Sequence, residues 1–158
     1  MIRLRFVTCN DQVSALIRLQ AGICMPFTPS HVECVSQDGK SYIGQHFDGG
    51  MKARPVGYDA AELQSEKIVE LDVSPPEETA FYAFVDSKID QPYDWESILD
   101  FVDPALNLHQ LNHLICSAMM TAALRSCGFF TWPLTVPFHH ISPRDLFLIL
   151  SSHVQIDH

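Results

Sequence analysis

The segment Ser74-Pro75-Pro76-Glu77 divides the sequence into two parts with different hydrophobic periodicity. A serine followed by prolines, with an acidic residue at the third helical position, is typical of a helix N-terminus. Before this segment most apolar residues alternate as in β-strands, whereas after it they recur at helical spacing. The sequence therefore predicts an α+β fold in which an antiparallel sheet packs against helices.

The strand-forming part is centred on a tight turn at Asp38-Gly39. This dipeptide between two alternating segments is a strong β-hairpin signal, and it joins expected strands at 31–36 and 41–47. The other expected strands complete an antiparallel meander and lie at residues 2–7, 51–54 and 66–73.

One helix is expected within the strand-forming part, capped by Asn10 or Asp11 and ended by Gly22. The second part is expected to form four helices, at residues 75–89, 95–102, 111–127 and 143–150. No repeat, low-complexity stretch or linker interrupts the chain. Residues 1–158 are therefore predicted to form a single domain, which is large enough to fold without a disulfide or a metal.

The balance of charge excludes several classes of partner. The chain has 19 acidic and 10 basic residues, a formal net charge of −9. Nucleic-acid binding requires a basic surface that displaces counterions, and anionic membrane surfaces also attract basic segments. We therefore expect neither partner, and the sequence predicts no oligomeric state.

The cysteine pattern and the apolar runs give an expected location. Five cysteines are present, an odd number at irregular spacing, which matches neither a disulfide framework nor a zinc motif. No apolar run is long enough to span a bilayer, and no secretory signal opens the sequence. We expect a cytoplasmic protein without a membrane span.

Cys116 is the candidate nucleophile. It lies near the start of the apolar helix expected at 111–127, where unpaired backbone N–H groups and the helix dipole lower a thiol's pKa. Cysteine is also among the most buried residue types, so a plain core position is the alternative interpretation. Cys127 stands at the other end of the same helix, where the dipole has the wrong sign for activation.

A nucleophilic cysteine requires a base, and two histidines lie across the Asp38-Gly39 hairpin from each other. His31 opens the first strand and His46 lies on the returning strand, so the two are expected to be close. Glu33 shares a strand face with His31 and is a candidate to orient it. The alternative interpretation is a solvent-exposed histidine pair on the polar face of the sheet.

Other histidines give weaker signals. His139 and His140 are adjacent and therefore poorly placed to bind one metal together. His109 and His113 have the spacing of a helical zinc motif, but Gln110 stands where that motif has glutamate. We expect neither a metal nor a cofactor.

Five short motifs, taken in order, resemble the circularly permuted branch of the NlpC-type papain-like superfamily, which includes the YiiX-like and lecithin:retinol acyltransferase-like proteins. In that branch the histidine precedes the cysteine, as it does here, and the resemblance covers roughly residues 5–150. The motifs are Asn10-Asp11-x-Val13-Ser14-x-Leu16-Ile17-Arg18, Ser30-His31-Val32-Glu33, Gly44-x-His46-x-x-Gly49-Gly50-x-x-x-Arg54-Pro55, Tyr93-Asp94-Trp95 and Cys116-Ser117.

The resemblance implies a papain-like fold with Cys116 as nucleophile and His31 as its base. His46 takes the position of the third polar residue, with Gln45 and Glu33 as alternatives because family members vary there.

The resemblance also implies a thiol-dependent amidase or peptidase, acting on substrates such as cell-wall peptides. Tyr93 and Glu33 are then candidates to contact a peptide or acyl substrate. Relatives that act on lipid esters make an acyltransferase or lipid esterase the first alternative. A non-catalytic structural or binding module of a phage particle is the second, because small proteins of this type are often phage- or prophage-encoded.

Overall fold

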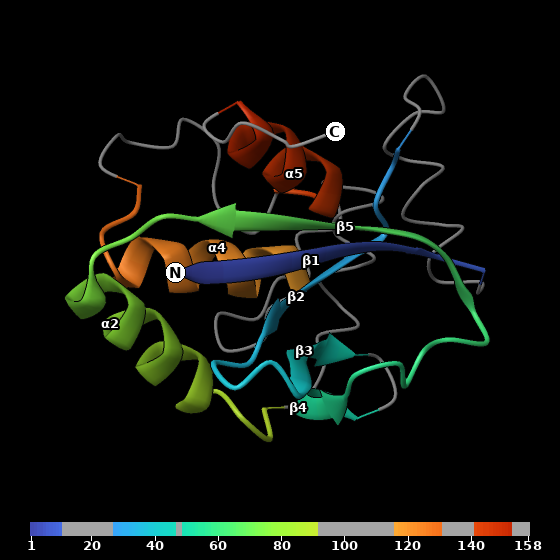
Figure 1. Cartoon of the computed structure of the whole chain (residues 1–158), viewed down its shortest axis with the longest axis horizontal. Helices are drawn as coiled ribbons and strands as arrows, with labels where there is room; N and C mark the ends of the chain where they lie inside the picture. The colour runs from blue at the N-terminus through green and yellow to red at the C-terminus, as the bar shows by residue number, and fades with distance from the viewer. Residues whose placement is uncertain (11–26, 47–48, 92–115, 131–140, 153–158) are drawn as a thin grey trace, which may run out of the picture.

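The computed structural model describes residues 1–10, 27–46, 49–91, 116–130 and 141–152. Within them, five strands form one antiparallel sheet with the order β4-β3-β2-β1-β5, and three helices pack beside it (Figure 1). The strands are β1 Ile2–Cys9, β2 His31–Val35, β3 Ser41–His46, β4 Gly50–Pro55 and β5 Leu63–Leu71. The helices are α2 Pro75–Asp86, α4 Cys116–Ser126 and α5 Pro143–Ser151. The α+β class and the antiparallel sheet are as predicted.

The hairpin between β2 and β3 forms at the predicted turn. Gly39 has φ of +73°, a left-handed conformation that glycine adopts without the steric cost of a side chain, and its N–H donates to Ser36 O. The following strand, β4, pairs with β3 and completes the expected meander. β5 instead returns to the opposite edge and pairs with β1, a partner that the sequence did not predict.

The helix termini follow the serine signals. Ser74 N–H donates to Glu77 Oε2 at the start of α2, and Ser142 Oγ accepts from Asp145 N–H at the start of α5. α2 ends at Asp86, three residues before its predicted end. The helices expected after Asn10 or Asp11 and at 95–102 lie outside the described residues, as does the first part of the helix expected at 111–127.

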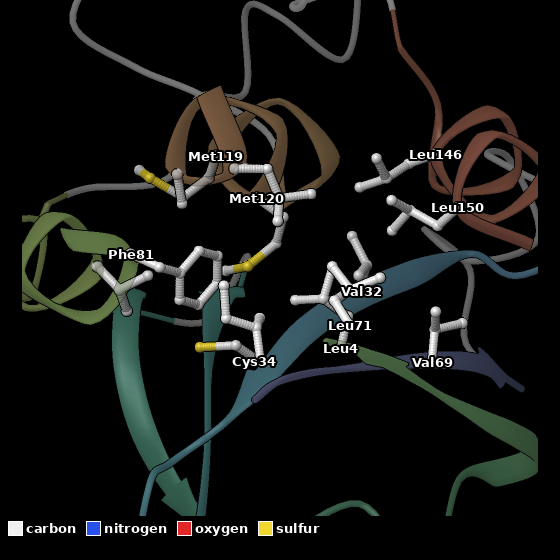
Figure 2. Packing of buried hydrophobic residues seen from close by; sticks show 14 of the residues in the cluster. Leu4, Val32, Cys34, Val69, Leu71, Phe81, Met119, Met120, Leu146 and Leu150 are labelled. Atoms are coloured by element: carbon white, nitrogen blue, oxygen red, sulfur yellow. The ribbon is translucent and has the colours of Figure 1, made fainter. Parts of the chain in front are cut away.

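One face of the sheet carries the hydrophobic core. Side chains from all three helices meet this face: Phe81 of α2, Met119 and Met120 of α4, and Leu146 and Leu150 of α5 (Figure 2). The strand residues below them include Leu4, Val32, Cys34, Val69 and Leu71. Alternation along each strand places these residues on the same side of the sheet. α4 contacts β2 and β3 and lies against both α2 and α5, so it is the central helix of this layer.

The centre of the opposite face of the sheet carries polar side chains that are also buried. Arg5 alternates with Leu4 and Phe6 along β1, and in the ladder between β1 and β2 it lies directly opposite Glu33. Both side chains are almost completely buried. The turn between β4 and β5 contributes Tyr58 and Asp59 to the same face. A buried cluster of polar side chains of this kind indicates a candidate functional site.

No helix among the described residues combines the length and the apolar character needed to cross a bilayer.

Candidate active site

The β2–β3 hairpin places two imidazole rings in contact. The ladder pairs Cys34 with Ile43 and Val35 with Tyr42, and the same register, continued along both strands, sets His31 opposite His46. Their Nε2 atoms are 3.2 Å apart. Both side chains are mostly buried, with 14% and 13% of their surfaces exposed, which differs from the alternative of a solvent-exposed pair.

Glu33 lies between these rings on the same face of β2. Its Oε2 atom is 3.2 Å from His46 Nε2 and 3.7 Å from His31 Nε2. Tyr58 completes the cluster, because its hydroxyl donates to Glu33 Oε2 at 3.2 Å and lies 3.0 Å from His46 Nε2. The Oε2 atom of Glu33 therefore has three polar neighbours, namely the two imidazoles and the Tyr58 hydroxyl.

The other oxygen of this carboxylate is fixed by Arg5. The guanidinium Nη1 donates to Glu33 Oε1 at 2.6 Å and to Asp59 Oδ2 at 2.9 Å, while Nε donates to Glu66 Oε2 at 2.6 Å. The guanidinium carbon also lies 4.2 Å from the centre of the Tyr42 ring. Arg5 therefore holds Glu33 in one orientation from beneath the histidines.

Cys116 is the first described residue of α4 and is buried against the start of β2. Burial raises the pKa of a thiol, but here the charge of His31 and a hydrogen bond with its ring outweigh burial and lower the pKa of Cys116. Hydrogen bonds from the backbone at Val32 and Ser117 act in the same direction. The thiolate is thus favoured at this position.

The pKa of the base, His31, is shifted in the opposite direction. Burial lowers the pKa of His31, but the negative charge of Cys116, their hydrogen bond and then Glu33 outweigh it and raise this pKa to about 10. Cys116 and His31 therefore favour a thiolate–imidazolium pair.

The second histidine is held neutral. Burial, followed by the positive charge of His31, lowers the pKa of His46 to about 4. Burial and then Glu33 raise the pKa of Tyr58, so its hydroxyl keeps its proton. Neutral His46 and Tyr58 can hydrogen-bond around the charged groups without adding charge to a buried site.

The structure brings together four of the residues singled out in the sequence, namely Cys116, His31, Glu33 and His46. Glu33 is fully buried beneath the histidines. Gln45 is also buried, and by strand alternation it lies on the face of β3 opposite His46. Tyr93 lies outside the described residues.

Sequence reasoning missed Arg5, Tyr58 and Asp59. Arg5 carried a usable signal, since a charged residue that interrupts an apolar strand must find partners if the strand is central. The strand pairing that matches it with Glu33 was not predicted. Tyr58 and Asp59 lie in a turn, where no periodicity distinguishes a buried side chain from an exposed one.

The space beneath the histidines requires glycine at position 44. A Cβ atom there would lie 2.7 Å from Glu33 Cβ, closer than packed atoms tolerate, and 3.4 Å from His31 Nε2. Gly44→Ala should therefore lower the free energy of unfolding by about 1–3 kcal/mol, measured by urea denaturation. Gly49→Ala is the matched control, because its Cβ would meet only the mobile end of Lys52, and it should change stability by less than about 1 kcal/mol. Equal stability of the two variants would contradict this close packing.

The same cluster also offers metal ligands. His31, Glu33 and His46 each present one ligand atom, and these three atoms all lie within 4.8 Å of one another. No family model matches the chain, and no curated protein does so at a significant level. The geometry of this site is therefore the basis for a functional assignment.

Proposed function

We propose that the protein is a thiol-dependent hydrolase of amide bonds, with Cys116 as nucleophile and His31 as its base. The observation that carries the proposal is the contact between the Cys116 thiol and the His31 ring, in which each group stabilises the charged form of the other. A cysteine on a helix that packs against a histidine-bearing strand is also what the resemblance to permuted NlpC-type papain-like enzymes implies. That fold assignment is part of the proposal.

In the first step the thiolate sulfur of Cys116 attacks the carbonyl carbon of the substrate. The carbonyl electron pair moves to oxygen and forms a tetrahedral oxyanion, for which the Cys116 backbone N–H is the nearest candidate donor. Losing one such donor commonly costs about 3–4 kcal/mol of transition-state stabilisation. The C–N bond then breaks, the amine takes the proton from His31, and a thioester remains on Cys116.

In the second step His31, now neutral, takes a proton from water as the water oxygen attacks the thioester. The C–S bond breaks, the acid product leaves, and the thiolate–imidazolium pair is restored. A different nucleophile in place of water gives acyl transfer by the same chemistry. Hydrolysis and acyl transfer at this site therefore differ only in the molecule that accepts the acyl group.

Glu33 and His46 act on the base rather than on the substrate. Both lie at the Nε2 side of His31, where they fix the ring and stabilise its positive charge. His46 occupies the third polar position expected from the resemblance, and Glu33 connects both rings to Arg5. In this proposal the third group of the triad is a carboxylate–imidazole pair rather than a single side chain.

The substrate class follows from charge. A protein with a net charge of −9 is repelled by acidic cell-wall polymers, so a short peptide or a lipid-like acyl compound is the favoured substrate. Cys34, Cys116 and Cys127 are thiols rather than disulfides. This supports the proposal that the enzyme works in a reducing compartment such as the cytoplasm.

Turnover of a panel of short cell-wall peptides and acyl esters tests the proposal. Cys116→Ala should reduce kcat/KM on any accepted substrate at least about 10³-fold, because the attacking atom is gone. Cys127→Ala, which removes a thiol at the far end of α4, should keep the wild-type rate. Equal rates for wild type and Cys116→Ala, or no turnover of the panel, would favour the non-catalytic binding module.

A further inference from the structure

Four polar atoms converge on one point between β2 and β3. His46 Nε2 lies 3.2 Å from His31 Nε2, 3.2 Å from Glu33 Oε2 and 3.0 Å from the Tyr58 hydroxyl. A ring nitrogen has either one hydrogen or one lone pair, so it can make one good hydrogen bond in the ring plane. Three contacts at this single atom are more than hydrogen bonding can satisfy.

A metal ion satisfies the same arrangement. Tetrahedral zinc with ligand bonds of about 2.0–2.2 Å sets its ligand atoms roughly 3.3–3.6 Å apart. The three separations among His31 Nε2, His46 Nε2 and Glu33 Oε2 are 3.2, 3.2 and 3.7 Å. Two imidazoles and one carboxylate, with the fourth position left open, are also a common ligand set for zinc.

The surroundings of these three residues also favour a cation. The second oxygen of Glu33 is held by Arg5, the outer-shell contact that orients a ligating carboxylate. Arg5 faces two further carboxylates, Asp59 and Glu66, and Arg54 lies near the Tyr58 ring. Once an ion replaces the proton on His31 Nε2, these three carboxylates and two guanidinium groups leave one negative charge in excess beside it.

The geometry points to a binding site for one divalent transition-metal ion of the zinc class, formed by His31, Glu33 and His46 with Tyr58 beside the open position. Cys116 contacts His31 from outside this ligand set. A bound ion joins β2 to β3 without using Cys116 as a ligand. It occupies Nε2 of His31, so it competes with the imidazolium form that the thiol chemistry proposed above uses.

Metal titration of the full chain tests this site. After removal of metal with EDTA, the wild-type protein should bind one equivalent of Zn²⁺ in calorimetry and should give a visible Co²⁺ spectrum typical of fewer than six ligands. His46→Ala and Glu33→Gln should each weaken Zn²⁺ binding at least about 100-fold, because outer-shell changes alone cost 10–100-fold. Zn²⁺ should raise the Tm of the wild type and leave that of His46→Ala unchanged.

Two controls separate this site from other metal ligands and from the proposed activity. Cys116→Ser should bind Zn²⁺ as the wild type does and give the same Co²⁺ spectrum, whether or not the protein is a hydrolase. The double variant His109→Ala/His113→Ala, which removes the histidine pair with helical zinc spacing, should also bind normally. Absence of stoichiometric binding, or binding that both His46→Ala and Glu33→Gln retain while folded by circular dichroism, would overturn the inference.

Discussion

Replacing His31 with alanine should slow the alkylation of Cys116 by iodoacetamide at least about tenfold at pH 6, and the difference should narrow as the pH rises past 9. In the wild type the imidazolium stabilises the thiolate, whereas without it burial holds the Cys116 pKa above the ordinary thiol value of about 8.5, so at most about 0.3% is ionised at pH 6. A less basic thiolate is also less nucleophilic, with a Brønsted slope of about 0.4–0.5, which offsets much of the gain in ionised thiol. As the pH rises past 9 the variant also gains thiolate, so the advantage of the wild type shrinks.

The measurement is mass mapping of each cysteine after limiting reagent, with EDTA present to keep the histidines free of metal. In the wild type Cys116 should react before the other four thiols. His31→Ala should leave the labelling of Cys34 and Cys127 unchanged, because neither is paired with a histidine. A Cys116 rate that does not change in His31→Ala would remove the physical basis of the nucleophile.

Replacing Arg5 with methionine should lower the free energy of unfolding by about 3–5 kcal/mol, the largest effect on stability expected for this chain. Methionine fills a similar volume but leaves Glu33, which is fully buried, without its strongest partner. Removing one member of a buried ion pair is costly because the remaining charge has no solvent to stabilise it. Asp59 also loses two hydrogen bonds from the guanidinium.

Urea denaturation of two comparison variants checks the cause of this loss. Arg5→Lys keeps the charge but cannot reach Glu33, Asp59 and Glu66 at once, so its stability should lie between those of wild type and Arg5→Met. Arg3→Met removes an arginine of the same strand whose side chain, within the described residues, bonds a backbone carbonyl and no carboxylate, and it should cost less than about 1 kcal/mol. Similar losses in Arg3→Met and Arg5→Met would contradict the special role of the buried pair.

The sequence predicted what local chemistry determines. Asp38-Gly39 specifies a tight turn by itself, and the pairing of the two strands about this turn then brings His31 and His46 together. The serine caps likewise depend on residues three positions apart. These signals are short in range, and for this reason they can be read without a structure.

What the sequence did not predict depends on contacts between distant segments. The contacts of Arg5 with Glu33, Asp59 and Glu66 join residues 28 to 61 positions apart. The pairing of β5 with β1 joins residues as distant in sequence as Ile2 and Leu71. Arg5 signals by its place in an apolar strand only that it needs partners, and no periodicity identifies Glu33, Asp59 and Glu66 as those partners. The same limit applies to Tyr58, whose position beside His46 depends on the path of the chain between β4 and β5.

The buried ion pairs of the sheet and the nucleophile come from different segments of the chain, and this affects how the protein tolerates mutation over evolutionary time. Arg5, Glu33 and Asp59 stabilise the sheet and also support the histidines, so a substitution at any of them impairs folding and chemistry together. Cys116 comes from α4 and supports no ion pair of that network, so its loss removes the nucleophile and leaves the folded scaffold in place. A lineage can therefore lose the thiol reaction in one step and keep a stable domain that evolves toward binding alone.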